Sequence, residues 1–116
     1  SQDANYPWFI LVPQLANVVE IHHLGEEQRL QLLNESCQLS EAIVDAFSPH
    51  KMNVAALGNV VPQLHIHHIA RFHDDPAWPK PIWGVVPAKD YDDTTLQQRI
   101  DALLELLKGD DFRVAE

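Results

Sequence analysis

The chain has 116 residues, the length of one ordinary domain, and we expect residues 1–116 to form a single domain. Hydrophobic residues make up 46% and charged residues 22%, values near the globular average that argue against fibrous or largely disordered structure. Asp and Glu outnumber Lys and Arg by 17 to 8, so the formal charge of −9 argues against broad electrostatic binding of nucleic acid or of an anionic membrane. This charge is compatible with one small nucleotide held by a few directed groups.

The single cysteine, Cys37, excludes an intramolecular disulfide and a cysteine zinc site, and it suits the reducing cytoplasm. The apolar run at residues 9–12 is far too short to span a bilayer. The chain opens with Ser1 and an acidic residue at position 3, without the basic start and apolar stretch of a signal peptide. We therefore expect a cytoplasmic protein. Because residue 1 is not Met, we expect that an N-terminal segment of the domain was either removed or is absent.

The first half of the chain predicts a strand followed by a long helix. Residues 8–12 are β-prone and end at Pro13, which is typical of a largely buried strand. Residues 25–47 predict the helix, and its apolar residues recur at three- and four-residue steps. These residues form one stripe that assigns the cysteine to the core: Leu30, Leu33, Cys37, Val44 and Phe47. Leu32, Leu39 and Ile43 lie beside it, so one stripe can serve the core and the other a partner chain.

The second half predicts two further strands and a last helix. Residues 51–57 and 61–72 read as strands on either side of a turn at Gly58 and Asn59. Residues 73–88 hold four of the eight prolines and two of the three tryptophans, which predicts an extended surface loop. Asp92 or Asp93 caps a final helix that Gly109 ends, with one apolar stripe: Leu96, Ile100, Leu103, Leu104 and Leu107.

Three of the seven histidines fall within residues 65–68 of the third strand. Side chains alternate between the two faces of a strand. The mostly apolar face should pack against the helices and make His68 a satisfied core histidine: Leu64, Ile66, His68 and Ala70. The polar face should line a cleft: Gln63, His65, His67, Ile69 and Arg71. Next-but-one residues on a strand lie ~6.6–7 Å apart, so two imidazoles can address the two sides of one phosphate.

Two imidazoles in such a row can bind a metal, carry out chemistry on phosphate, or be half-exposed polar residues without a function. A metal site wants a third carboxylate or histidine ligand. Residues 68–74 contain no Glu, and Arg71 would repel a cation. This pattern weakens the metal hypothesis, and we expect neither a metal nor another cofactor.

The segment Gly58-Asn59-Val60-Val61-Pro62-Gln63-Leu64-His65-Ile66-His67-His68-Ile69 resembles the signature of the histidine triad (HIT) family. In this alignment Gln63 stands at the first triad histidine, His65 at the second and His67 at the third. The strand ending at Pro13 and the segment at residues 20–24 are also similar to the family, and His22 then matches a fourth active-site histidine. The resemblance covers about residues 7–73 and is strongest to a bacterial subgroup with Gln-x-His-x-His.

The resemblance implies an α+β fold, with an antiparallel sheet, one long helix and one C-terminal helix, in a homodimer. It implies a nucleotide hydrolase or nucleotidyl transferase in which His65 attacks the α-phosphate and forms a covalent nucleotidyl-histidine. His67, as a cation, would neutralise phosphate charge, and Asn59 would donate a hydrogen bond towards the leaving group. The substrate-binding residues would be His22, Gln63, Arg71 and Asn53. Arg71 could instead pair with Asp74 or Asp75 and have no further role.

This chemistry is sensible for imidazole, because its pKa near ~6.5 leaves a nucleophilic lone pair at neutral pH. A covalent intermediate also splits one difficult displacement into two easier steps. Gln63 departs from the triad, since an amide carries neither proton nor charge. The alternative is therefore a non-catalytic nucleotide-binding or interaction module on the same fold. Trp78 and Trp83 could pack an interface or stack a base.

Overall fold

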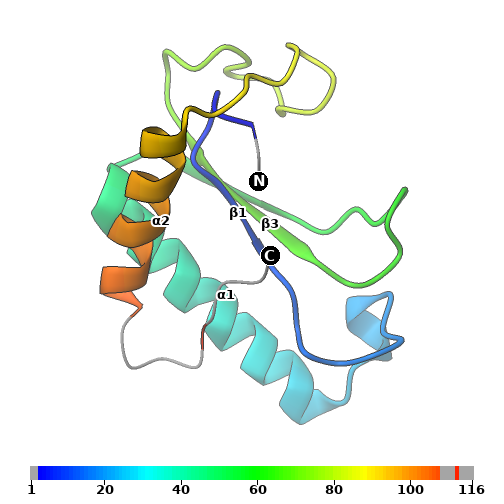
Figure 1. Ribbon diagram of the computed structural model, residues 1–116. Helices are drawn as coiled ribbons and strands as arrows, with labels where there is room; N and C mark the ends of the chain where they lie inside the picture. Colours follow the sequence, from blue (N-terminus) through cyan, green and yellow to red (C-terminus); the bar gives the residue numbers. More distant parts are fainter. Residues whose placement is uncertain (1–2, 108–111, 113–116) are drawn as a thin grey trace.

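The computed structural model describes residues 3–107 and residue 112. Their element order is β1 (Trp8–Leu11), the 3-10 helix η1 (Ile21–His23), α1 (Glu26–Phe47), β2 (Lys51–Ala55), β3 (Ile66–Arg71) and α2 (Asp93–Leu106). The strands form one antiparallel sheet in the order β1-β3-β2, so β3 is central. Figure 1 shows the long α1 running along the sheet, with α2 beside it. The expected α+β fold is confirmed.

The third strand is shorter than the sequence pattern indicates. It begins at Ile66, and the five preceding residues do not join the sheet. Pro62 cannot donate to a ladder, and the Leu64 amide instead donates to the Val18 carbonyl (2.8 Å) in the loop after β1. His65 therefore lies at the junction between an irregular segment and the strand. This position leaves its side chain at the end of the sheet.

Both helices begin at sequence signals, and α1 also ends at one. Gln28 reaches back so that its Oε1 accepts from the Gly25 amide (2.9 Å), and Ser48 ends α1 in the left-handed region (φ 50°) before Pro49. The Asp92 carboxylate caps α2 by accepting from the Thr95 amide (2.6 Å), as expected. The predicted end at Gly109 lies outside the described residues.

The side of α1 that packs against the sheet carries the second of the two apolar stripes predicted from the sequence, the one with Leu32, Leu39 and Ile43. Its buried residues are Leu32, Leu39, Ala42 and Ile43. Leu30 and Leu33 are each 60% exposed, Val44 is 44% exposed, and Cys37 is exposed. The expectation that Cys37 belongs to the core is wrong. Because apolar residues occur on two sides of this helix, periodicity alone could not decide which side meets the sheet.

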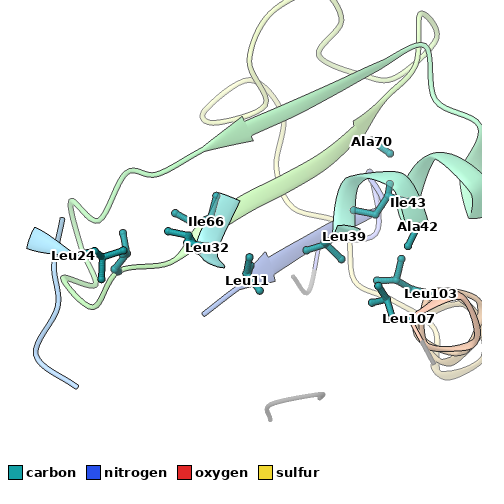
Figure 2. Packing of buried hydrophobic residues seen from close by; sticks show 11 residues of the cluster. Leu11, Leu24, Leu32, Leu39, Ala42, Ile43, Ile66, Ala70, Leu103 and Leu107 are labelled. Atoms are coloured by element: carbon teal, nitrogen blue, oxygen red, sulfur yellow. The ribbon is translucent and has the colours of Figure 1, made fainter. Parts of the chain in front are cut away.

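Two apolar clusters cover the two faces of the sheet. The larger one lies between the sheet and the helices, as Figure 2 shows for its side chains. It contains Leu11 from β1, Ile66 and Ala70 from β3, the buried stripe of α1, and Leu103 and Leu107 from the C-terminal region. The smaller cluster covers the opposite face: Tyr6, Ile69, Ala77 and Ile82, with Trp8 packed against it. The proline-rich segment forms no regular element, as expected. Its Ala77 and Ile82 cover Ile69 on the face that was expected to line a cleft.

No helix within the described ranges is long and apolar enough to cross a membrane.

Candidate functional site

The alternation of side chains along β3 separates His67 from His68. His68 is fully buried on the helix side, where its Nε2 lies 2.7 Å from the Ser36 hydroxyl of α1 and its Nδ1 lies 3.0 Å from the Ile66 carbonyl. A carbonyl only accepts, so Nδ1 carries the proton and Nε2 accepts from the Ser36 hydroxyl. Burial lowers the pKa of His68 and keeps this ring neutral. His68 is the satisfied core histidine that the sequence predicted.

His65 is half-buried, and a backbone contact fixes the tautomer of its neutral ring. Its Nδ1 lies 2.7 Å from the Gln63 carbonyl oxygen. Because that oxygen can only accept, Nδ1–H donates and Nε2 carries the lone pair in the neutral ring. The Gln63 side chain points elsewhere, since its amide Nε2 donates to the Leu15 carbonyl (3.2 Å). Gln63 therefore has two structural roles. Its backbone carbonyl orients the His65 ring, and its side chain binds the loop after β1.

A cavity of about 440 Å³ opens beside His65. Its walls come from the segment before α1, the first turns of α1, the turn after β2 and the segment before β3. Its apolar wall includes Val19, Ile21, Leu57 and Leu64, and its polar groups include Glu20, His22, Arg29, Gln63 and His65. This volume lies within the range of small-ligand pockets, and one apolar wall facing a few polar groups suits a ligand with one apolar and one charged end.

His67 lies next to His65 but in a different environment. The two ring centroids are 5.0 Å apart, and His67 is only 7% exposed. Its Nδ1 accepts a hydrogen bond from the indole Nε1 of Trp8 (2.9 Å), and the Trp83 ring lies 5.2 Å away. Burial, together with His65, lowers the pKa of His67. The neutral ring is thus favoured at neutral pH, which disagrees with the cationic His67 expected from the sequence.

Comparison with known proteins agrees with this geometry. Residues 1–74, more than half of the chain, match the family model of the HIT domain. The chain belongs to the HIT family. Comparison with curated proteins gives no match.

Solved structures of HIT proteins superpose closely on this chain. The histidine triad protein of Bradyrhizobium japonicum is 48% identical with a TM-score of 0.87, over 90% of this chain and 78% of that one. A HIT protein of Sinorhizobium meliloti 1021 is 36% identical with a TM-score of 0.87, over 91% and 78%. A histidine triad protein of Marinobacter aquaeolei VT8 is 48% identical with a TM-score of 0.82, over 91% and 80%.

Two residues that the HIT resemblance assigned to substrate binding lie elsewhere. Arg71 is 1% exposed and donates from Nε to Asp75 (2.7 Å), from Nη1 to Asn53 (2.8 Å) and from Nη2 to Asp75 and the Lys80 carbonyl. Neither Arg71 nor Asn53 lines the cavity. The strand alternation placed Arg71 on the correct face. The proline-rich segment covers that face, and the carboxylate of its Asp75 forms an ion pair with the Arg71 guanidinium. We therefore leave both residues out of the proposed site.

The other expected residues stay close to the cavity. His22 lines it from η1, and exposed Asn59 directly follows the cavity-lining Gly58. Arg29 also lines the cavity, and its Nη2 donates to the His22 carbonyl (3.0 Å). Sequence reasoning missed Arg29, because a single basic residue on an exposed helix turn has no pattern to distinguish it. Its one signal is its place seven residues after His22, within reach of the same loop.

Within residues 3–107 and residue 112, no group of three or more His, Cys, Asp or Glu side chains is arranged to hold a metal ion.

Proposed function

We propose that this HIT protein is a nucleotide hydrolase or nucleotidyl transferase that acts on an α-phosphate through a covalent intermediate on His65. The observation that carries the proposal is the 2.7 Å contact between His65 Nδ1 and the Gln63 carbonyl, which makes Nε2 the unprotonated nitrogen of a residue lining the cavity. Such a nitrogen needs no base to remove a proton before it attacks. The tautomer is thus set by the fold rather than by substrate.

The first step forms a bond between His65 Nε2 and phosphorus and breaks the bond from phosphorus to the leaving group, which departs with its electron pair. In the second step water attacks phosphorus, the phosphorus–Nε2 bond breaks, and the nucleoside monophosphate leaves with the proton of water released to solvent. In a transferase another nucleophile replaces water. The Nδ1–H of His65 stays bonded to the Gln63 carbonyl throughout, so the ring keeps its orientation.

The cavity supplies the remaining contacts. The nucleoside packs against the apolar wall of Val19, Ile21 and Leu57, while the phosphates lie towards His65. Arg29 brings a positive charge to that side, and His22 adds a ring nitrogen beside it, which an anionic substrate needs in a chain of net charge −9. Asn59, beside the glycine turn, donates to the leaving group. The protein acts in the cytoplasm and uses neither a metal nor another cofactor.

A nucleotidyl adduct tests this proposal directly. The protein would be mixed with a panel of adenylylated and guanylylated compounds, denatured without acid and examined by mass spectrometry. We expect an adduct on His65 in the unchanged protein and in His73→Ala, which alters an exposed histidine outside the cavity. The adduct should vanish in His65→Ala and decrease in His67→Ala. An adduct on His67 would overturn the proposed alignment.

The competing function is a nucleotide-binding module without catalysis. The observation that favours it is Gln63, which replaces a proton-carrying histidine with an amide engaged at the Leu15 carbonyl. Binding of nucleotide with no adduct and no turnover would support this alternative.

We further propose a homodimer formed through the exposed side of α1. Leu30 and Leu33 are each 60% exposed there, and Val44 and Cys37 continue the same side. A row of apolar residues on the solvent side of a helix is typical of a subunit contact. Light scattering at micromolar concentration should report twice the mass of one chain, and a clean monomer would contradict the proposal.

A further inference from the structure

Trp8 and His67 contact each other across the two strands β1 and β3. Trp8 pairs with Ile69 in the sheet, so its side chain lies on the same face as His67, two residues along β3. The indole Nε1 is 2.9 Å from His67 Nδ1, and the two ring centroids are 5.5 Å apart. The Trp83 ring meets both of them edge-on, at 5.8 Å and 5.2 Å. His67 is thus enclosed on this side by two indoles.

The direction of this hydrogen bond assigns the proton on His67. An indole N–H can only donate, so His67 Nδ1 must carry a lone pair. In the neutral ring the proton then lies on Nε2. This is the opposite tautomer from His65 and His68, whose Nδ1–H groups donate to carbonyls two residues earlier. Protonating Nδ1 of His67 would set two N–H groups against each other, so Trp8 opposes the cation.

A neutral His67 with its proton on Nε2 can donate a hydrogen bond but cannot act as a general acid. Its Nε2–H can donate a hydrogen bond to a phosphate oxygen next to His65, whose ring centroid is 5.0 Å away. It cannot give that proton away, because an imidazolate would remain and Trp8 blocks Nδ1 from taking up another proton. Gln63, at the first triad position, has no proton to give either. Two of the three triad positions therefore supply no general acid.

The lack of a general acid at these two triad positions bears on the leaving group, provided that His65 is the nucleophile as proposed above. When a phosphorus–oxygen bond of an anhydride breaks, the phosphate departs as a stable anion and needs no proton. When the phosphorus–nitrogen bond of a phosphoramidate breaks, the amine must gain a proton as it leaves. We propose that Trp8 is a positioning residue that holds His67 as a neutral donor, and that the enzyme consequently prefers nucleotide anhydrides to nucleotide phosphoramidates.

The titratable groups around this pair are few among the described residues. His65 and His68 act on His67 from the same segment, and β1 and the Trp83 loop present indole rings to it. His22 and Glu20 line the cavity from the segment before α1, so His22→Gln serves as a separate test of a proton from that side. Burial and His65 lower the pKa of His67, in agreement with the geometry.

Two substrates that deliver the same adenylyl group to His65 test the specificity. We would compare kcat/KM for diadenosine triphosphate, an anhydride, with that for adenosine 5′-phosphoramidate. General acid catalysis contributes roughly 10²–10⁴-fold, so the unchanged enzyme should prefer the anhydride by about 100-fold or more. Equal kcat/KM values on the two substrates would overturn the inference and leave the proposed function standing. A selective loss of phosphoramidate turnover in His22→Gln would then identify His22 as the source of the proton. Turnover of neither would overturn both.

Two tryptophan variants test the role of Trp8. Trp8→Phe keeps an aromatic ring but removes the donor, so the pKa of His67 should rise by about one unit, because a hydrogen bond of typical strength corresponds to that shift. At a pH well above both titration midpoints the cationic fraction of His67 then grows about tenfold, and the preference for the anhydride should narrow by about tenfold there. Trp83→Phe removes a neighbouring indole and leaves the Trp8 donor, so it should change neither quantity.

Nitrogen NMR of the full chain gives a readout that needs no activity. The unchanged protein at pH 7 should show His67 as the Nε2–H tautomer, and Trp8→Phe should raise its titration midpoint. An Nδ1–H tautomer or an imidazolium in the unchanged protein would overturn the inference. So would an unaltered midpoint in a folded Trp8→Phe variant. If that variant does not fold, the His67 tautomer and the substrate preference of the unchanged protein still test the inference.

Discussion

Replacing Asp75 by asparagine removes the charge that neutralises Arg71 beneath the proline-rich segment. The pair is buried, with side-chain exposures of 1% for Arg71 and 4% for Asp75, and the carboxylate also accepts from the amides of Phe72, Ala77 and Trp78. Although burial opposes the charged form, Arg71 and these amides lower the pKa of Asp75 from 3.8 to about 2. A shift of this size corresponds to about 2.5 kcal/mol of native-state stability at neutral pH.

Asp75→Asn should therefore cost about 3 kcal/mol, because it also leaves a buried guanidinium without a countercharge. For a domain of this size the loss corresponds to a fall in Tm of roughly 10 °C or more. Thermal and urea unfolding at pH 7, followed by circular dichroism, measure it. Asp74→Asn is the matched control, since Asp74 is the exposed neighbour, and it should change stability by less than about 0.5 kcal/mol.

The pH dependence gives a second measurement with a definite sign. The folded pKa of Asp75 lies below its unfolded value, so the unfolded chain binds more protons between these values. The contribution is complete above about pH 4 and is lost as the pH falls towards 2. Asp75→Asn should lack this part of the acid sensitivity. A variant with an unchanged Tm at pH 7, or with the same acid sensitivity as the unchanged protein, would refute the reasoning.

Three other changes have expected outcomes. Arg29→Ala should raise KM for a polyphosphate substrate about tenfold with little change in Tm, measured by steady-state kinetics, because Arg29 lines the cavity from an exposed helix turn. Ser36→Ala should cost about 1–3 kcal/mol by leaving His68 Nε2 buried without a donor, whereas Ser36→Ala combined with His68→Val should be nearly neutral in urea unfolding. Leu33→Asp should convert the proposed dimer to a monomer by light scattering, and an unchanged dimer mass would place the subunit contact elsewhere.

The sequence predicted the features that depend on local patterns. The alternation along β3 correctly placed His68 against the helices, and the acidic cap located the start of α2. The structure also brings His22, Gln63 and His65 to one cavity, and their roles there stay predictions. The strand and helix predictions share a cause, because the pleat of a strand and the cap of a helix depend only on neighbouring residues.

The failures concern contacts between distant segments. Cys37 lies on an apolar stripe, but the sheet packs against the other side of α1. For Arg71 the sequence left open a phosphate role or a pair with a nearby aspartate, and it gave no sign that Asn53 of β2 and the Lys80 carbonyl would join the Asp75 pair. His67 was expected as a cation, and only the pairing of β1 with β3 shows that the Trp8 indole donates to it. No local pattern carries such information.

The adjacent histidines of β3 also determine where the chain can change length. His67 lies on the site face and His68 on the helix face, so one inserted or deleted residue within Ile66–Arg71 would exchange their environments and move Ile69 and Ala70 out of their clusters. Residues 85–88 belong to no helix or strand and lie between the Trp83 contact and the α2 cap, so they are free of that constraint. A library of single-residue insertions and deletions should therefore yield folded, active clones with changes at residues 85–88, and almost none with changes inside the strand.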